Sequence, residues 1–185
     1  HKEVRNMFAQ IQKEFGGLDV LVNNAGVLYR GKPEDLDEST WDRIFAVNVK
    51  GTFMCSMEAA KIMKNRDNPT IINISSVAAL IAVPSEIPYG ASKAAIDSLT
   101  KSLAEHFAPY IRVNGIAPGL VETDMNTGPT AEKFKDPEFM SKMPVRRWAK
   151  PYEMADIALF LVDTARFVNG ETIVADGGFR ITIRK

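Results

Sequence analysis

Cysteine and histidine, the residues that most often form cross-links or bind transition metals, are nearly absent from this sequence. Its 185 residues include one cysteine, Cys55, and two histidines, His1 and His106. A lone cysteine excludes a disulfide within the chain, and two histidines so far apart do not make a zinc-binding set. We therefore expect no metal site, which excludes the alcohol dehydrogenases that depend on zinc.

The sequence also lacks an excess of charge and any long apolar run. Lysine plus arginine and aspartate plus glutamate each number 23, so the formal net charge is zero. No basic stripe invites nucleic acid or anionic lipid, and the longest apolar stretches, such as 157–162, are far too short to span a membrane. We expect a small-molecule substrate and neither a nucleic-acid nor a membrane partner.

The first residues, His1-Lys2-Glu3, include no initiator methionine, and no apolar core of a signal peptide follows them. We expect a cytoplasmic protein and a sequence that starts within a longer polypeptide. A composition of 45% hydrophobic and 25% charged residues is ordinary for a globular domain.

Strand and helix signals alternate along the chain. Apolar, β-branched runs predict strands at 19–22, 71–74, 111–116 and 171–175, and helical spacing predicts helices over 4–15, 41–60, 89–106 and 151–161. Ser39 or Thr40 is expected to cap the second helix. Because strands joined through helices run parallel, we predict one α/β domain over residues 1–185, with a doubly wound parallel sheet flanked by helices.

The segment 75–93 has a pattern suited to proton transfer. Ser75 and Ser76 follow a predicted strand, and ligands bind at the carboxyl ends of strands in open α/β sheets. Tyr89 and Lys93 are four residues apart on one helix face, where the ammonium would lower a phenol pKa of about 10. A serine hydroxyl and this phenol could hold a carbonyl while hydride arrives. The segment favours carbonyl/alcohol redox chemistry, although Tyr-x-x-x-Lys alone often arises by chance.

Three other segments have a plain structural reading beside a functional one. The small residues at 23–26 follow a strand and let backbone approach a flat ligand, but such a signal alone is more often a turn. Asn48 and Gly51 are poor helix formers within an apolar stripe, either tolerated there or functional. The residues 117–123 form a shaped turn because proline and glycine restrict the backbone in opposite ways.

Residues 125–148 are too irregular for one continuous helix. We predict a mobile substrate flap with short helices, which acts as a lid. Its apolar side chains either line a substrate cavity or belong to the core; they are Met125, Phe134, Phe139, Met140, Met143 and Trp148.

Taken in order, these motifs resemble the short-chain dehydrogenase/reductase family over essentially the whole chain. The set comprises Asn-Asn-Ala-Gly at 23–26, Asn48-x-x-Gly51, Ser76, Tyr89-x-x-x-Lys93, Pro118-Gly119 with Thr123, and Asp176-Gly177-Gly178. The resemblance implies a Rossmann-like fold and Tyr89 as general acid/base. It also implies that Lys93 lowers the tyrosine pKa and binds the nicotinamide ribose, that Ser76 orients the substrate carbonyl, and that Asn48 helps hold a water chain.

The resemblance further implies two walls of an NAD or NADP site. The wall on the adenine-ribose side would be formed by Asn24, Ala25 and Gly26, and the wall on the carboxamide side by Pro118, Gly119, Val121 and Thr123. Ser75 competes with Ser76 for the catalytic role, but the distance to Tyr89 in similar sequences favours Ser76. Ser75 would then cap the strand end.

The resemblance fails at the start of the fold. Family members begin with a strand and the turn Thr-Gly-x-x-x-Gly-x-Gly, whose amides bind pyrophosphate at a helix N-terminus. No such spacing occurs in the 185 residues. We expect the N-terminal part of the sheet to be missing from this chain, because parts of a longer polypeptide are absent.

We predict an NAD(P)-dependent oxidoreductase that interconverts a carbonyl and a secondary alcohol, similar to 3-oxoacyl-carrier-protein reductases and to sugar or polyol dehydrogenases. By resemblance it forms a homotetramer or homodimer through the helices carrying Asn48 and Tyr89. The alternative is a non-catalytic, truncated Rossmann-like binding module. A sugar-nucleotide epimerase also uses Tyr-x-x-x-Lys, but it fits the segments 23–26 and 118–119 less well.

Overall fold

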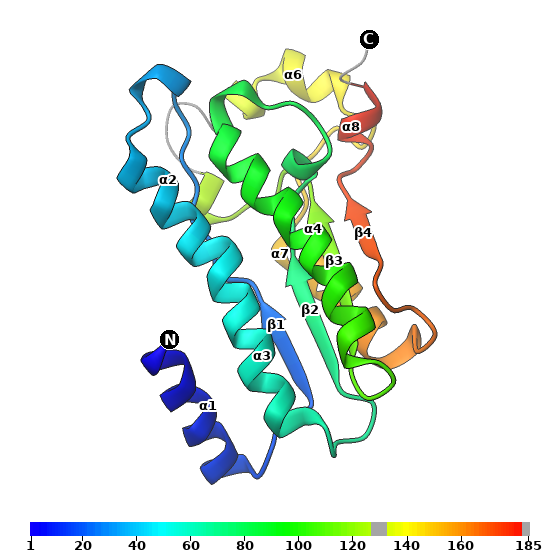
Figure 1. The fold of residues 1–185 in the computed structure, drawn as a ribbon. Coiled ribbons are helices and arrows are strands. Elements are labelled where there is room, and N and C mark those ends of the chain that lie inside the picture. The colour runs from blue at the N-terminus through cyan, green and yellow to red at the C-terminus, as the bar shows by residue number, and fades with distance from the viewer. Residues whose placement is uncertain (127–132, 183–185) are drawn as a thin grey trace.

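A parallel sheet lies at the centre of the protein in the computed structural model, which describes residues 1–126 and 133–182. The sheet has four strands in the order β1-β2-β3-β4, and each neighbouring pair is parallel (Figure 1). The strands are β1 (Val20–Asn23), β2 (Thr70–Ile74), β3 (Arg112–Pro118) and β4 (Thr172–Ala175). The predicted α/β class is confirmed, and each strand lies within two residues of its predicted bounds.

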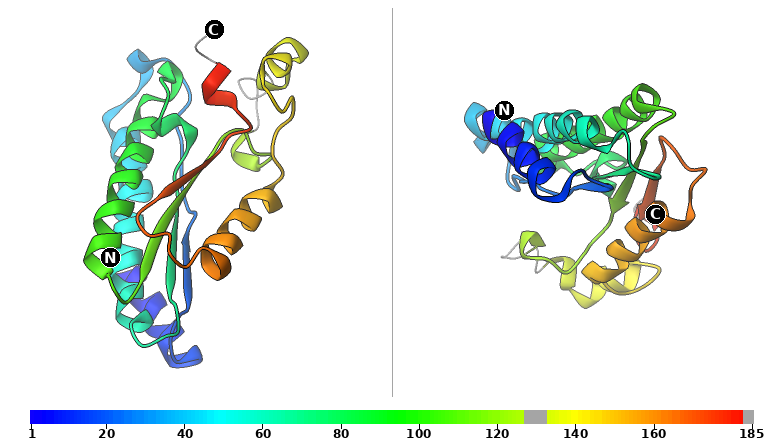
Figure 2. Two further views of the ribbon diagram at one scale, coloured as in Figure 1. Left: turned by 90° about the vertical axis from the view of Figure 1, so that its right-hand side faces the viewer. Right: turned by 90° about the horizontal axis from the view of Figure 1, so that it is seen from below.

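Helices cover both faces of this sheet (Figure 2). One face carries α1 (Lys2–Phe15), α2 (Glu38–Phe45), α3 (Thr52–Met63) and α4 (Ile87–Phe107), and the other carries α7 (Pro151–Leu159). Side chains alternate along a strand, so Ile71 and Val113 pack under α1, α3 and α4, whereas Ile72 and Ile116 pack against the α7 side. All four are fully buried. This two-sided core makes the fold Rossmann-like and doubly wound.

The helix predicted over 41–60 is interrupted. Between α2 and α3 the chain forms a π-helix, η2 (Ala46–Gly51), and Asn48 lies within it. The predicted cap was wrong: Asp37 precedes the helix, and its carboxylate accepts the backbone N–H of Thr40 at 2.7 Å. An aspartate side chain reaches that N–H from the position just outside the helix, where Ser39 and Thr40 already have helical backbone.

Short helical segments occupy the loops around the sheet. They are η1 (Pro33–Asp35), η3 (Val77–Ala79), η4 (Pro84–Glu86), η5 (Asp124–Asn126), η6 (Lys133–Lys135), α6 (Pro137–Lys142), η7 (Phe160–Thr164) and α8 (Phe179–Thr182). The predicted flap, 125–148, contains short helices as expected, although 127–132 lie outside the described residues. Met143 and Trp148 are buried, so part of the flap belongs to the core, whereas Met125 is 41% exposed.

Candidate active site

The carboxyl ends of β1, β2 and β3 open onto a cavity of about 550 Å³. Its walls come from the loop after each strand and from the first turns of α4. Ligand sites in open α/β sheets lie at this edge of the sheet. Ten of the residues predicted from sequence line this cavity: Asn24, Ala25, Gly26, Ser76, Tyr89, Lys93, Pro118, Gly119, Val121 and Thr123. Asn48 is the one predicted site residue that does not line this cavity.

Tyr89 and Ser76 approach each other in this cavity. The phenol is largely buried, and that burial raises its pKa above the usual value, with smaller opposing effects from a hydrogen bond to Ser76 and from the charge of Arg30. The negative charge of Glu86 raises the pKa further. At neutral pH the phenol is therefore protonated and able to donate.

Close packing holds the two hydroxyls in place. The Ser76 hydroxyl accepts the backbone N–H of Ala78 at 3.1 Å, which fixes the loop at the start of η3. At Gly90 an added Cβ would lie 2.8 Å from the carbonyl oxygen of Ala78, a distance that real side chains do not tolerate. The absence of a side chain at Gly90 thus lets α4, which carries Tyr89, lie directly against the Ser76 loop.

Lys93 lies beneath the same cavity with 4% of its surface exposed. Its Nζ donates to the carbonyl oxygen of Ile74 at 2.7 Å and lies 5.6 Å from the ring centroid of Tyr89. Burial lowers the pKa of Lys93 to about 8, and the charge of Asp97 only partly opposes this. Burial of the phenol is the largest effect on the Tyr89 pKa and raises it, and the expectation that Lys93 lowers this pKa stays a prediction.

Ser75 and Asn48 hold the site together from behind. The Ser75 hydroxyl donates to the backbone oxygen of Lys93 at 3.2 Å, so it ties β2 to α4, which leaves Ser76 as the hydroxyl beside Tyr89. The Asn48 amide donates to the oxygen of Val27 and to the Ser92 hydroxyl, both at 2.9 Å. Its Oδ1 also accepts the backbone N–H of Val27.

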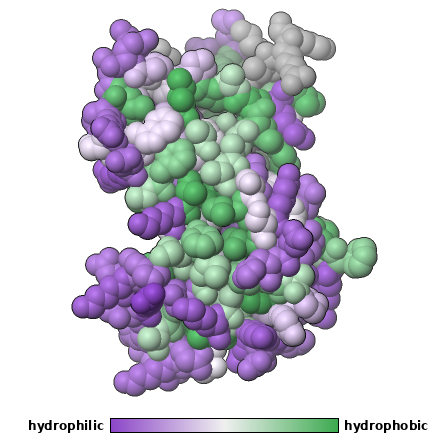
Figure 3. Space-filling view, in the orientation of Figure 1, coloured by the Kyte–Doolittle hydropathy of each residue, from purple (hydrophilic) through white to green (hydrophobic). Residues whose placement is uncertain are grey.

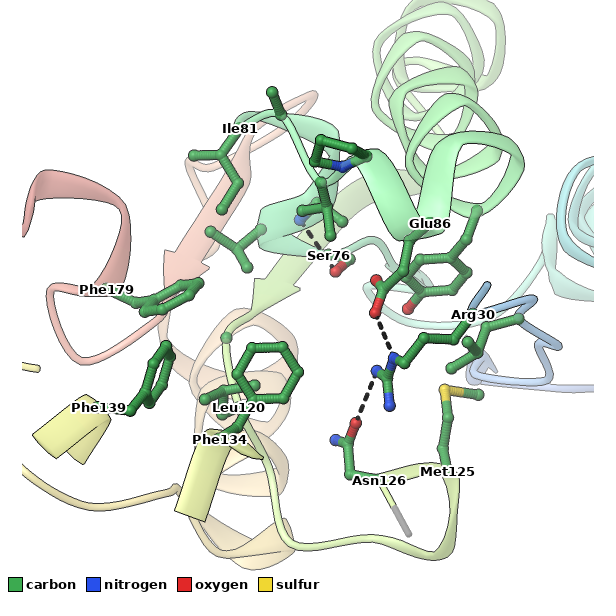
Figure 4. A pocket seen from close by; sticks show the side chains of 18 residues that line it. Arg30, Ser76, Ile81, Glu86, Leu120, Met125, Asn126, Phe134, Phe139 and Phe179 are labelled. Carbon is green, nitrogen blue, oxygen red and sulfur yellow. Dashed lines mark hydrogen bonds and ion pairs between the residues drawn. The ribbon is translucent and has the colours of Figure 1, made fainter. Parts of the chain in front are cut away.

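A pair of charged residues that the sequence reasoning missed lies beside Tyr89. Arg30 Nε and Glu86 Oε1 are 2.6 Å apart, although 56 residues separate them in the chain. They line a second cavity of about 280 Å³, which Ser76 and Tyr89 also line (Figure 4). Nothing in the sequence pairs these two residues; only the charge of Glu86, three residues before Tyr89, could have drawn attention to them.

Comparison with known proteins identifies the family of this chain. Residues 1–180 match the family model described as enoyl-(acyl carrier protein) reductase. The chain is 38% identical to the NAD-dependent glycerol dehydrogenase of Listeria innocua, over 97% of this chain and 71% of that enzyme. The chain belongs to the short-chain dehydrogenase/reductase family.

Two solved short-chain dehydrogenase/reductase structures share the fold. The gluconate 5-dehydrogenase of Burkholderia cenocepacia, in complex with NADP and tartrate, has a TM-score of 0.89 and 34% identity, over 98% of this chain and 72% of that one. A doubly substituted variant of a Serratia marcescens short-chain dehydrogenase/reductase has a TM-score of 0.85 and 35% identity, over 95% of this chain and 71% of that one. This protein is thus an NAD(P)-dependent oxidoreductase that acts on carbonyl and alcohol groups.

The larger cavity fits the nicotinamide end of such a dinucleotide. An added Cβ at Gly26 would lie against Lys93 Nζ at 3.6 Å and Asn48 Oδ1 at 3.4 Å, which are ordinary contact distances, so it would fill this part of the wall without a clash. Lys93 and Thr123 offer donors to ribose and amide groups along its walls. The glycine-rich turn that binds pyrophosphate in the family does not occur in the 185 residues, and no described helix is long and apolar enough to cross a membrane.

Proposed function

We propose that Tyr89 is the general acid/base of a reversible ketone reduction and that Ser76 orients the substrate oxygen. One observation carries this proposal: Ser76 and Tyr89 line both cavities, the larger of which suits the nicotinamide and the smaller the substrate. A carbonyl placed between their hydroxyls has access to both cavities. Sites that bring the reacting groups together in this way gain rate by orientation.

The proton that the reaction needs comes from side chains of this protein. A nicotinamide cofactor, when bound in the larger cavity, would supply the hydride. The Tyr89 hydroxyl donates its proton to the carbonyl oxygen as negative charge develops there, and the Ser76 hydroxyl donates a hydrogen bond to the same oxygen. Lys93 binds the ribose, and its pKa of about 8 suits it to return a proton towards Tyr89 near neutral pH. Asn48 would hold the water chain that serves Lys93.

The test is Tyr89→Phe, which keeps the ring and removes only the hydroxyl. We expect turnover to fall by about a hundred- to ten-thousand-fold, the usual worth of general acid/base catalysis. Circular dichroism checks that the fold is kept, and Tyr152→Phe, at a 65% exposed tyrosine, is the matched control. Turnover of Tyr89→Phe near that of the wild type, with cofactor bound, would overturn the assignment.

Binding of the cofactor is tested by titrating the protein with NADH and with NADPH, followed by fluorescence. An NAD(P)-dependent enzyme binds at least one of the two, whereas the non-catalytic module that the sequence left open would bind neither. The stronger of the two titrations also identifies the preferred cofactor.

We further propose that residues 125–148 form the substrate flap and that the protein is a cytoplasmic homotetramer or homodimer. Met125, Phe134 and Phe139 of the flap line the smaller cavity. Figure 3 shows apolar side chains gathered over α3 and α4, where Phe53 is 39% exposed and Ala94 is also exposed. A single cysteine without a disulfide partner suits a reducing compartment, which cell fractionation can test.

A further inference from the structure

The smaller cavity has two chemically different halves (Figure 4). Aromatic and aliphatic side chains form one half: Ile81, Leu120, Phe139 and Phe179. Phe134 lies at the boundary, because its ring centroid is 5.8 Å from Arg30 Cζ. The other half has a polar corner made by Arg30, Glu86 and Asn126. Ser76 lies between the two halves in this view. A substrate whose oxygen lies at Ser76 and Tyr89 therefore extends one substituent into each half.

The polar corner is unusual because its ion pair is buried. The Arg30 and Glu86 side chains are 13% and 9% exposed, whereas Lys61 and Arg147, in the pairs with Glu58 and Glu153, are 62% and 58% exposed. Burying such a pair costs desolvation energy that the attraction repays only in part, so it is weak evidence for a stabilising role. Its position on the wall of a cavity points instead to ligand recognition.

The hydrogen bonds of Arg30 indicate what it recognises. A guanidinium has five N–H donors. Within the described residues, Nε donates to Glu86 and Nη2 reaches Asn126 Oδ1 at 3.4 Å, a long contact that a substrate oxygen can replace. Glu86 balances the charge of Arg30, and a second carboxylate in this corner would be repelled by Glu86. An uncharged oxygen takes the donors that the described residues leave unused, without that repulsion.

We propose, on the basis of the function proposed above, that Arg30 selects substrates with an uncharged oxygen-bearing substituent on the reacting carbon. The preferred substrate is then a ketone or secondary alcohol with an apolar group on one side and a neutral hydroxyl or carbonyl group on the other. Arg30 acts as a specificity determinant and takes no part in the proton transfer.

Three ketones with the same apolar side test this proposal. Benzylacetone carries a methyl group on the other side of its carbonyl, a second compound carries a hydroxymethyl group there, and a third carries a carboxylate. We expect kcat/KM to be at least roughly tenfold higher for the hydroxymethyl ketone than for either of the others, as expected where a site is built to hydrogen-bond a substrate hydroxyl.

The double variant Arg30→Met/Glu86→Gln removes both charges, so no unpaired charge is left in the cavity. In it the preference for the hydroxymethyl ketone over benzylacetone should fall to within about threefold. Arg147→Met, which breaks an exposed ion pair elsewhere, is the matched control and should keep the full preference. A preference retained in the double variant, or a preference for the carboxylate, overturns the proposal.

Binding measurements separate this proposal from the function on which it rests. If none of the three ketones is turned over, the proposed reaction fails, but ligand-observed NMR still gives their dissociation constants with and without cofactor. Tighter binding of the hydroxymethyl ketone by at least about tenfold, lost in the double variant, supports the role of Arg30. Equal binding of all three ketones contradicts it, whatever the turnover.

Discussion

Among single residues that carry a charge, Lys93 is the most deeply buried that the structure describes. The residue is 4% exposed, and within the described part of the chain its ammonium donates to the carbonyl oxygen of Ile74. Desolvation lowers its pKa from 10.5 to about 8 because the protein around it stabilises the charge less than water does. A lysine kept this close to losing its proton costs stability, and such costs are typical of functional sites.

The free energy that it costs to bury the Lys93 ammonium predicts how the stability of the protein depends on pH. The folded pKa lies below the unfolded one, so the penalty is complete below pH 8 and disappears as pH rises towards 10.5. The free energy of unfolding of the wild type, relative to Lys93→Met, should therefore rise by about 2–3 kcal/mol between pH 7 and pH 10. Urea denaturation at several pH values measures this difference. Lys101→Met, on the exposed face of the same helix, should show no such trend; a flat Lys93→Met difference would contradict the burial of the charge.

At the scale of elements, a buried polar layer joins β1 and β2 to α3 and α4. Asn23 Nδ2 donates to Asn73 Oδ1 at 2.8 Å and to the Ser56 hydroxyl at 3.0 Å, and Asn73 Nδ2 donates to the Thr100 hydroxyl at 3.0 Å. Asn73, Ser56 and Thr100 have no exposed surface. Because every member bonds to another, the layer specifies how the two helices are placed over the strands.

Asn73 is the central member of this layer, so its removal should be costly. Asn73→Ala removes one acceptor of the Asn23 amide, which keeps its bond to Ser56, and the donor to the Thr100 hydroxyl, which keeps its bond to the Ile96 carbonyl oxygen. With the two lost hydrogen bonds and the small cavity that opens, we expect a loss of about 1–3 kcal/mol in the free energy of unfolding. Chemical denaturation checks this, with Asn65→Ala on the surface as control. A loss below about 0.5 kcal/mol would show that the layer is not structural.

The elements that sequence patterns predicted are those with strong periodicity. Alternating or continuous apolar runs gave the strands, and strand ends predicted where Ser76 and Gly119 would meet, since parallel strands bring their carboxyl ends to one edge. β3 extends to Pro118 rather than 116 because β4 pairs with it there, and this depends on tertiary contacts. The π-helix and the cap by Asp37 depend on local geometry that residue spacing does not encode.

The Arg30–Glu86 pair was missed for a different reason. Each residue lies in a loop, without periodicity, and the contact between them arises only when the strands place those loops side by side. The direction of the Tyr89 pKa shift could likewise not be predicted from the sequence. Helical spacing predicted Lys93 nearby, but the direction of the shift depends on how deeply the phenol is buried.

At the scale of the whole molecule, the exposed apolar surface over α3 and α4 predicts self-association. Phe53 and Ala94 should be covered by another copy of the chain, because large exposed apolar patches mark contact sites. Sedimentation velocity at micromolar concentration should show a dimer or tetramer, and Ala94→Arg should reduce its size. Ala9→Arg, on an exposed position of α1, is the control. A monomer at every concentration would contradict this assembly.

The close contact at Gly90 has a consequence for how such an enzyme can diversify. Any side chain at this position would push α4 away from Ala78, and with it Tyr89 away from Ser76, since a Cβ would lie 2.8 Å from that carbonyl oxygen. Residues such as Arg30 and Phe134 line the substrate cavity without taking part in that contact. A library that randomises the cavity wall should therefore yield variants with new substrate ranges, whereas one that randomises position 90 should return almost exclusively glycine.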